Sequence, residues 1–137
     1  MKKQILLLVV FSAAFALNIM SQGVNTATND STEIIFNEVD HNFGTVAYKG
    51  DASFEFVFKN TGKAPLIIKH VQSSCGCTTP FYDTQPVAPK AKGKIMVKFD
   101  SERIGPFIKS IKVFSNAKNS PIELIIRGEI KSPDNPK

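Results

Sequence analysis

Apolar and polar side chains alternate in Ala52-Ser53-Phe54-Glu55-Phe56-Val57-Phe58-Lys59. Successive side chains of a strand point to opposite faces, so the phenylalanines share one face while Ser53, Glu55 and Lys59 share the other. Residues 94–100 and 122–130 alternate in the same way. One buried and one solvated face are typical of strands in antiparallel sandwiches, so the pattern predicts an all-β fold.

Shorter candidate strands lie at residues 33–36, 65–72 and 107–115, and turn sequences rich in Gly, Pro and Asn separate the segments. Six or seven strands without an amphipathic helix predict an immunoglobulin-like antiparallel β-sandwich of about seven strands. An up-and-down barrel is the alternative architecture. Of the eleven phenylalanines, Phe11 and Phe15 belong to an N-terminal apolar run, and the others are expected mostly in the core.

The N-terminus has the pattern of a secretion signal. Lys2 and Lys3 precede an apolar run from Ile5 to Leu17, which is shorter than the about 20 residues of a membrane span. We predict a signal peptide over residues 1–21, with an uncleaved signal anchor as the alternative. The mature chain would then be exported without a membrane span, most simply to the periplasm, with secretion or surface location as alternatives.

The remaining chain divides into three parts. Residues 22–32 form a polar leader, 33–131 the immunoglobulin-like domain, and 132–137 a disordered tail. In the leader, Asp30-Ser31-Thr32 resembles the acceptor triplet of the O-glycosylation system of Bacteroidota, which makes Ser31 a candidate for glycosylation. An ordinary polar spacer is the alternative.

Charge and motifs argue against several functions. Removing Lys2 and Lys3 from the 17 Lys and Arg residues leaves 15 against 12 Asp and Glu, a net charge of +3. No arginine cluster interleaved with aromatic residues is present, so nucleic-acid binding is not expected. The chain also lacks a Gly-x-Ser-x-Gly elbow, a Gly-rich phosphate loop and a carboxylate-rich calcium loop. We therefore expect no catalytic residues.

Several spaced motifs carry a family resemblance. They are Asn42-Phe43-Gly44-Thr45-Val46, Phe58-Lys59-Asn60-Thr61-Gly62, Ser74-Cys75-Gly76-Cys77-Thr78 and Arg127-Gly128-Glu129. In this order they resemble the bacterial domain-of-unknown-function family 1573. The resemblance implies an immunoglobulin-like fold akin to Hydin and major-sperm-protein domains, in exported proteins of Bacteroidota and related bacteria. It implies no established activity. The chain departs from the family in having Pro89-Lys90 where a Pro-Gly turn is usual, and no tryptophan beside Phe81-Tyr82.

Cys75 and Cys77 are the chain's two cysteines, and they lie within the motif that runs from Ser74 to Thr78. In a strand, residues two apart have Cα atoms about 6.5–7 Å apart, at or beyond the usual disulfide range of about 4.4–6.8 Å. A Cys75–Cys77 disulfide therefore requires a bend, which Gly76 would permit. Export to an oxidising compartment favours this bond, and its small ring should make it easily reduced.

Three other interpretations of the cysteine pair stay open. Two thiolates suit Cu(I), and His70, five residues before Cys75, is a candidate third metal ligand. A free thiol could attack a partner's disulfide, although no helix follows Cys77 to lower its pKa. The cysteines could also form disulfides between subunits. Copper is the one cofactor that the sequence suggests.

Two functions follow from these observations. The first is an exported non-enzymatic protein-binding or scaffold module, which recognises an unknown extracytoplasmic protein through a sheet edge or the loops beside Cys75. The second is a periplasmic copper-binding or thiol-redox protein that uses Cys75 and Cys77. The fold cannot separate them, because sandwiches host many functions.

Overall fold

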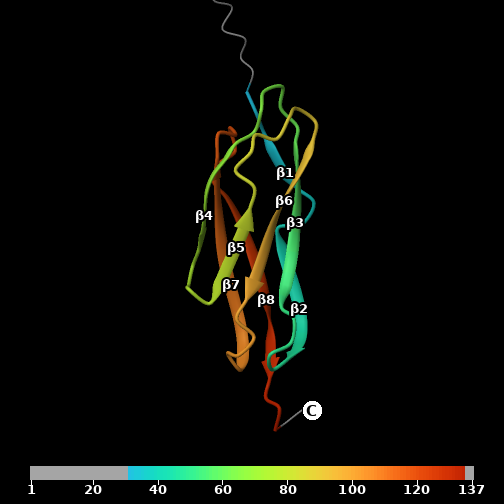
Figure 1. Cartoon of the computed structure of the whole chain (residues 1–137), viewed down its shortest axis with the longest axis vertical. Coiled ribbons are helices and arrows are strands. Elements are labelled where there is room, and N and C mark those ends of the chain that lie inside the picture. Colours follow the sequence, from blue (N-terminus) through green and yellow to red (C-terminus); the bar gives the residue numbers. More distant parts are fainter. Residues whose placement is uncertain (1–30, 135–137) are drawn as a thin grey trace, which may run out of the picture.

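The structure, a computed structural model, describes residues 31–134. The predicted signal peptide, most of the predicted leader and the last three residues of the predicted tail lie outside the described residues. Two four-stranded sheets pack face to face (Figure 1). In spatial order the first sheet contains β1 (Ile34–Phe36), β3 (Ser53–Asn60), β6 (Lys92–Phe99) and β5 (Thr78–Tyr82). The second contains β2 (Asp40–Ala47), β8 (Ile122–Lys131), β7 (Gly105–Ser115) and β4 (Ile68–Ser73).

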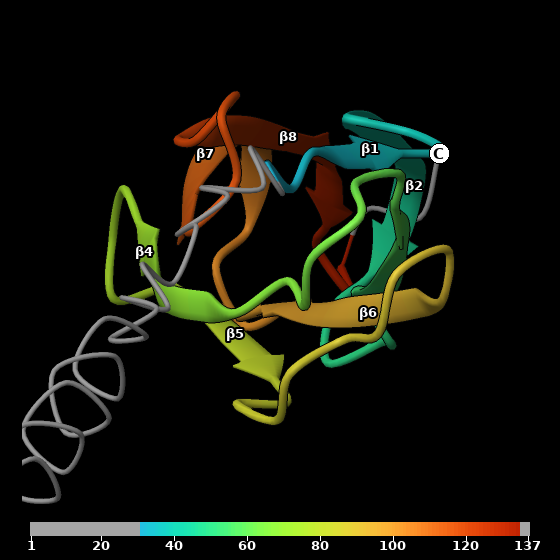
Figure 2. The ribbon, with the colours of Figure 1, turned by 90° about the horizontal axis from the view of Figure 1, so that it is seen from above.

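Two separate sheets confirm the predicted sandwich and exclude the barrel. Seen from above, β5 and β6 lie on the side of the core opposite β7 and β8 (Figure 2). Residues 31–134 contain eight strands, in keeping with the about seven expected, although the sequence pattern did not reveal β2 and β5. No helix that is long and apolar enough to cross a membrane occurs within residues 31–134.

The expectation of a wholly antiparallel arrangement was wrong at β2. This strand follows β1 after three residues, passes to the second sheet, and pairs in parallel with β8. It does not pair with β1 or β3, its neighbours in sequence, but with β8 near the end of the domain. Arg127 of β8 donates from Nε to Oδ1 of Asp40 at 2.9 Å. The hydrogen bond with Asp40, together with its negative charge, raises the pKa of Arg127.

The core lies between the sheets and consists of the inward side chains of the alternating segments. Phe56 and Phe58 of β3 are buried as predicted, and Phe99 of β6 stacks on Phe107 of β7 with ring centroids 3.8 Å apart. Burying each such side chain stabilises the fold by roughly 1.5–3 kcal/mol. The other fully buried large side chains are aliphatic: Ile34, Leu66, Ile95, Val97, Ile111, Val113, Leu124, Ile126 and Ile130.

Asn60 is a buried polar residue at the end of β3. Its Oδ1 accepts hydrogen bonds from Thr32 Oγ1 at 2.8 Å and from the Gly62 N–H at 3.0 Å. Its Nδ2 donates to the carbonyls of Ala64 and Val87 at 2.8 and 3.0 Å. Thr32 is also buried, so the packed part of the domain includes this residue, which the sequence analysis placed at the end of the leader.

His41 of β2 has partners that its sequence context did not suggest. Its ring stacks on Phe54 of β3, with centroids 3.5 Å and planes 10° apart. Its Nδ1 lies 3.0 Å from Oε1 of Glu38. A histidine of the second sheet thus contacts a phenylalanine of the first, so it contributes to packing between the sheets.

Candidate functional site

The cysteine motif forms the turn between β4 and β5, where the chain passes from the second sheet to the first. The Ser74 N–H donates to the carbonyl of Ser110 in β7 at 2.9 Å, and the Asp100 N–H donates to the carbonyl of Cys77 at 2.8 Å. Each end of the turn is therefore bonded to a different sheet.

The sulfur atoms of Cys75 and Cys77 lie within bonding distance, and the Cα atoms are 5.3 Å apart. This separation lies within the range that a disulfide requires. Cys77 is buried and Cys75 is half-buried. The Thr78 hydroxyl lies 3.8 Å from the sulfur of Cys75 and 3.9 Å from that of Cys77.

Gly76 is not needed for the bend between the two cysteines, contrary to what its position suggests. Its φ does not lie in the left-handed region, and a Cβ added there would meet no atom within 4 Å. The bend that brings the two cysteines together therefore does not depend on a glycine at this position.

His70, the candidate third metal ligand, is not brought to the cysteines. It lies opposite Phe114 of β7, on which its ring stacks at 6.0 Å, whereas Ser74 bonds to Ser110. Phe114 and Ser110 are four positions apart on β7, which corresponds to about 13 Å along the strand. Within residues 31–134, no three His, Cys, Asp or Glu side chains form a group that could hold a metal ion.

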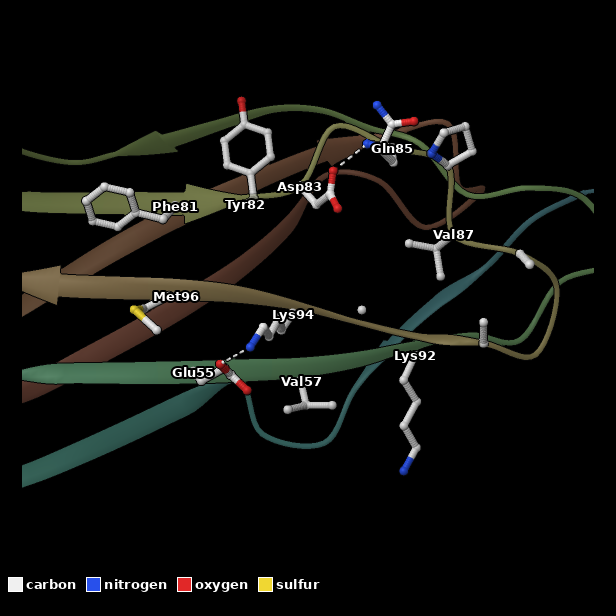
Figure 3. A pocket seen from close by; sticks show the side chains of 14 residues that line it. Glu55, Val57, Phe81, Tyr82, Asp83, Gln85, Val87, Lys92, Lys94 and Met96 are labelled. Carbon is white, nitrogen blue, oxygen red and sulfur yellow. Dashed lines mark hydrogen bonds and ion pairs between the residues drawn. The ribbon is translucent and has the colours of Figure 1, made fainter.

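A groove lies on the outer face of the first sheet, beside β5. Its volume is about 990 Å³, and it is bounded by β3, β5, β6 and the loop of residues 83–91. Figure 3 shows the side chains that line it. The apolar ones include Val57, Phe81, Val87 and Met96, and the ion pair of Lys94 with Glu55 crosses the floor at 2.8 Å.

The most exposed apolar surface of the groove comes from two directly opposed residues. Phe81 of β5 pairs in register with Met96 of β6, and the two are 55% and 40% exposed. Large apolar side chains grouped on a solvated sheet face mark an interaction surface more often than single ones do.

The loop that forms one wall of the groove is held by backbone bonds. Val87 and Leu66 exchange N–H to carbonyl hydrogen bonds at 2.8 and 2.9 Å. Asn60 also donates to the Val87 carbonyl at 3.0 Å, and the Lys90 N–H donates to the carbonyl of Asn60 at 2.8 Å. Because these bonds connect the loop to the core, the groove is largely pre-formed.

The edges of the first sheet are protected against strand addition. The bond from the Asp100 N–H to the Cys77 carbonyl fixes the hydrogen-bonding pattern between β5 and β6. In this pattern the backbone N–H and carbonyl positions of residue 80 point away from β6. That residue is Pro80, which has no N–H. At β1, the outward N–H and carbonyl of Ile34 are bonded to the side chain of Asn119 at 3.2 and 2.7 Å.

The second sheet has bulges in its edge strands. β2 is irregular between Asn42 and Thr45, where Gly44 adopts φ +64°, and β4 is irregular between Ile68 and His70, with the exposed Lys69 at that point. Bulges and edge lysines are common protections against pairing with another chain. The described edges therefore offer less for recognition than the groove does.

The groove could not be recognised in the sequence. Its lining residues come from three strands and a loop, and no short motif joins them. One signal was present, because Met96 occupies a position among the polar residues that alternate with Ile95, Val97 and Phe99. A single apolar residue on a solvated face is ordinary, and it indicates an interaction surface only when another, such as Phe81, lies beside it.

Comparison with solved structures shows the fold. A protein of unknown function from Porphyromonas gingivalis W83 is 13% identical with a TM-score of 0.65, over 73% of this chain and 47% of that one. The PapD-like domain 7 of human CEP192 is 11% identical with a TM-score of 0.62, over 75% of this chain and 89% of that domain. The secreted serine protease VesC of Vibrio cholerae is 10% identical with a TM-score of 0.54, over 72% and 23%.

These similarities establish an immunoglobulin-like, PapD-like sandwich. This chain spans about half the length of the P. gingivalis protein and about a quarter of VesC. No curated protein matches the sequence. The model of the DUF1573 family, described as a protein of unknown function, matches residues 34–130. The chain therefore belongs to the DUF1573 family.

Proposed function

We propose that this protein is an exported, non-enzymatic module that binds another protein through the groove beside β5. The observation that carries this proposal is the exposed Phe81–Met96 pair, displayed on a rigid sheet within a groove of about 990 Å³. Aromatic residues and methionine are enriched in the centres of protein interfaces, and polar residues form the rim. Here Lys92, Lys94 and Glu55 are charged residues that line the groove beside the apolar pair.

The place of action follows from the N-terminal sequence. The positive residues and apolar run before residue 22 support export, and the periplasm is the compartment that requires no further signal. An oxidising compartment would also keep Cys75 and Cys77 joined. The partner is then an extracytoplasmic protein.

Photocrosslinking in the native bacterium tests this function. The photoreactive residue p-benzoylphenylalanine is placed at position 81, or at position 108 as a control. Ile108 is 71% exposed and lies in β7 of the other sheet. We expect a discrete crosslinked protein from position 81 and none from position 108. Equal products at the two positions, or no product at either, would refute binding through the groove.

A copper-binding or thiol-redox function is the second candidate. It is favoured by the adjacent sulfur atoms and by Cys75, which is only half-buried and so within reach of a reactant. Substituting Cys75→Ala and Cys77→Ala together separates the candidates. A protein-binding module retains the crosslink from position 81, whereas a thiol-dependent protein loses its copper or its exchange activity. The intact mass of the exported protein, alkylated without reduction, reports whether the thiols are free.

A further inference from the structure

Two lysines oppose each other on the outer face of the first sheet, and one of them, Lys92, lines the groove. Lys59 of β3 and Lys92 of β6 are cross-strand partners, and both are exposed. Like charges directly opposite each other destabilise an antiparallel pair. Lys94 is neutralised by Glu55, whereas neither Lys59 nor Lys92 forms an ion pair with a carboxylate of residues 31–134.

The apolar pair lies at a fixed distance from these lysines. Lys92 and Met96 point to the same face of β6, four residues apart, which corresponds to about 13 Å. The surface therefore presents positive charge at Lys59 and Lys92 and apolar area at Met96 and Phe81, in line along the strand.

We propose that the groove binds an extended segment of the partner protein in which an acidic residue and a large apolar residue stand four positions apart. The acidic side chain pairs with Lys59 and Lys92, and the apolar one contacts Phe81 and Met96. In an extended chain, residues i and i+4 lie on one side and about 13 Å apart, which matches the spacing of the groove. In a helix the same residues are only about 6 Å apart, so a helical segment does not fit. This inference rests on the proposed function and specifies the chemistry of the partner.

Titration of the ¹⁵N-labelled protein with a designed peptide tests the inference. The probe is acetyl-Glu-Ser-Thr-Ser-Phe-Ser-Thr-Ser-Glu-amide, which has a glutamate four positions from phenylalanine in either chain direction. One control peptide has lysine in place of both glutamates, and another moves each glutamate one position closer to phenylalanine. At low ionic strength we expect the probe to bind about tenfold more tightly than either control. The amide shifts should be largest at residues 81 and 92–96.

Charge reversal in the protein provides a second measurement. The variant Lys59→Glu/Lys92→Glu should prefer the lysine peptide, whereas Lys69→Glu/Lys112→Glu, on the other sheet, should keep the original preference. Equal binding of all peptides, binding of none, or the same change in both variants would overturn the inference. If position 81 crosslinks to a partner while the peptides fail, the proposed function stands and only the acidic, extended partner is rejected.

Discussion

Gly93 of β6 lies directly opposite Phe58 of β3, and a Cβ atom added at Gly93 would lie 2.4 Å from Cζ of the phenylalanine ring. Phe58 is buried against Phe36, with ring centroids 5.4 Å apart. The ring therefore occupies the volume that a side chain at position 93 would fill. Close packing is the reason that glycine is required here. Backbone conformation is not the reason, because the φ of Gly93 lies outside the left-handed region.

The variant Gly93→Ala should lower the free energy of unfolding by about 2 kcal/mol, because the added methyl group forces the Phe58 ring or the backbone to move. Urea unfolding of the purified protein measures this change. Gly76→Ala is the matched control, since a Cβ there meets nothing within 4 Å. A loss of the same size at both positions would show that the packing of Phe58 is not the cause.

Replacing Asn60 with alanine should destabilise the protein by about 3 kcal/mol. Four hydrogen bonds are lost, and buried partners including the Gly62 N–H and the Thr32 hydroxyl are left unsatisfied. Asn42→Ala serves as the control, because Asn42 is exposed and makes a single bond to the Gly44 N–H. If both variants unfold at the same urea concentration, the network around Asn60 contributes little.

Removing both sulfur atoms, through Cys75→Ala and Cys77→Ala, should leave a folded protein that is less stable by about 1.5 kcal/mol. The ring closed by the two cysteines is small, so it restricts the unfolded chain only slightly. The bonds from Ser74 to Ser110 and from Asp100 to Cys77 use backbone carbonyls, so both connections of the turn survive. Thermal unfolding monitored by circular dichroism, with and without reductant, checks this. An unfolded variant would contradict a purely local contribution.

Pro80→Thr should create a protein that self-associates. The substitution restores an N–H at the position of β5 that faces away from β6, and so completes an edge on which a second chain can pair. Sedimentation velocity over a range of concentrations should reveal a dimer fraction that rises with concentration. Pro89→Thr, in the loop, should sediment like the parent protein. Monomeric behaviour of Pro80→Thr would mean that another feature protects this edge.

Much of the fold could be predicted from the sequence because its strands have one buried and one solvent-exposed face. The alternation in residues 52–59 and 94–100 predicted β3 and β6, and Phe56, Phe58, Ile95 and Phe99 are indeed buried. β2 was missed because its parallel partner lies about 85 residues away and the bulge at Gly44 breaks the period. β5 was missed because residues 78–82 show no alternation of apolar and polar side chains. Pro80 is tolerated in this strand because it stands at an outward position of an edge.

The candidate site could be predicted only in part. The cysteine pair was visible because a two-residue spacing is a local property of the chain. The groove depends on the register that places Phe81 opposite Met96, and a register is a property of the assembled sheet. The distance of His70 from the cysteines is likewise set by how β4 pairs with β7. Neither could be read from the order of residues alone.

The parallel pairing of β2 with β8 also dictates when this domain can form. A chain that emerges from its N-terminus presents β2 long before its partner has been made. β8 lies between β2 and β7, so β2 cannot join the second sheet until the chain has been made to about residue 131. Pairing of such distant segments is slow. The second sheet is therefore complete only once nearly the whole domain has been synthesised.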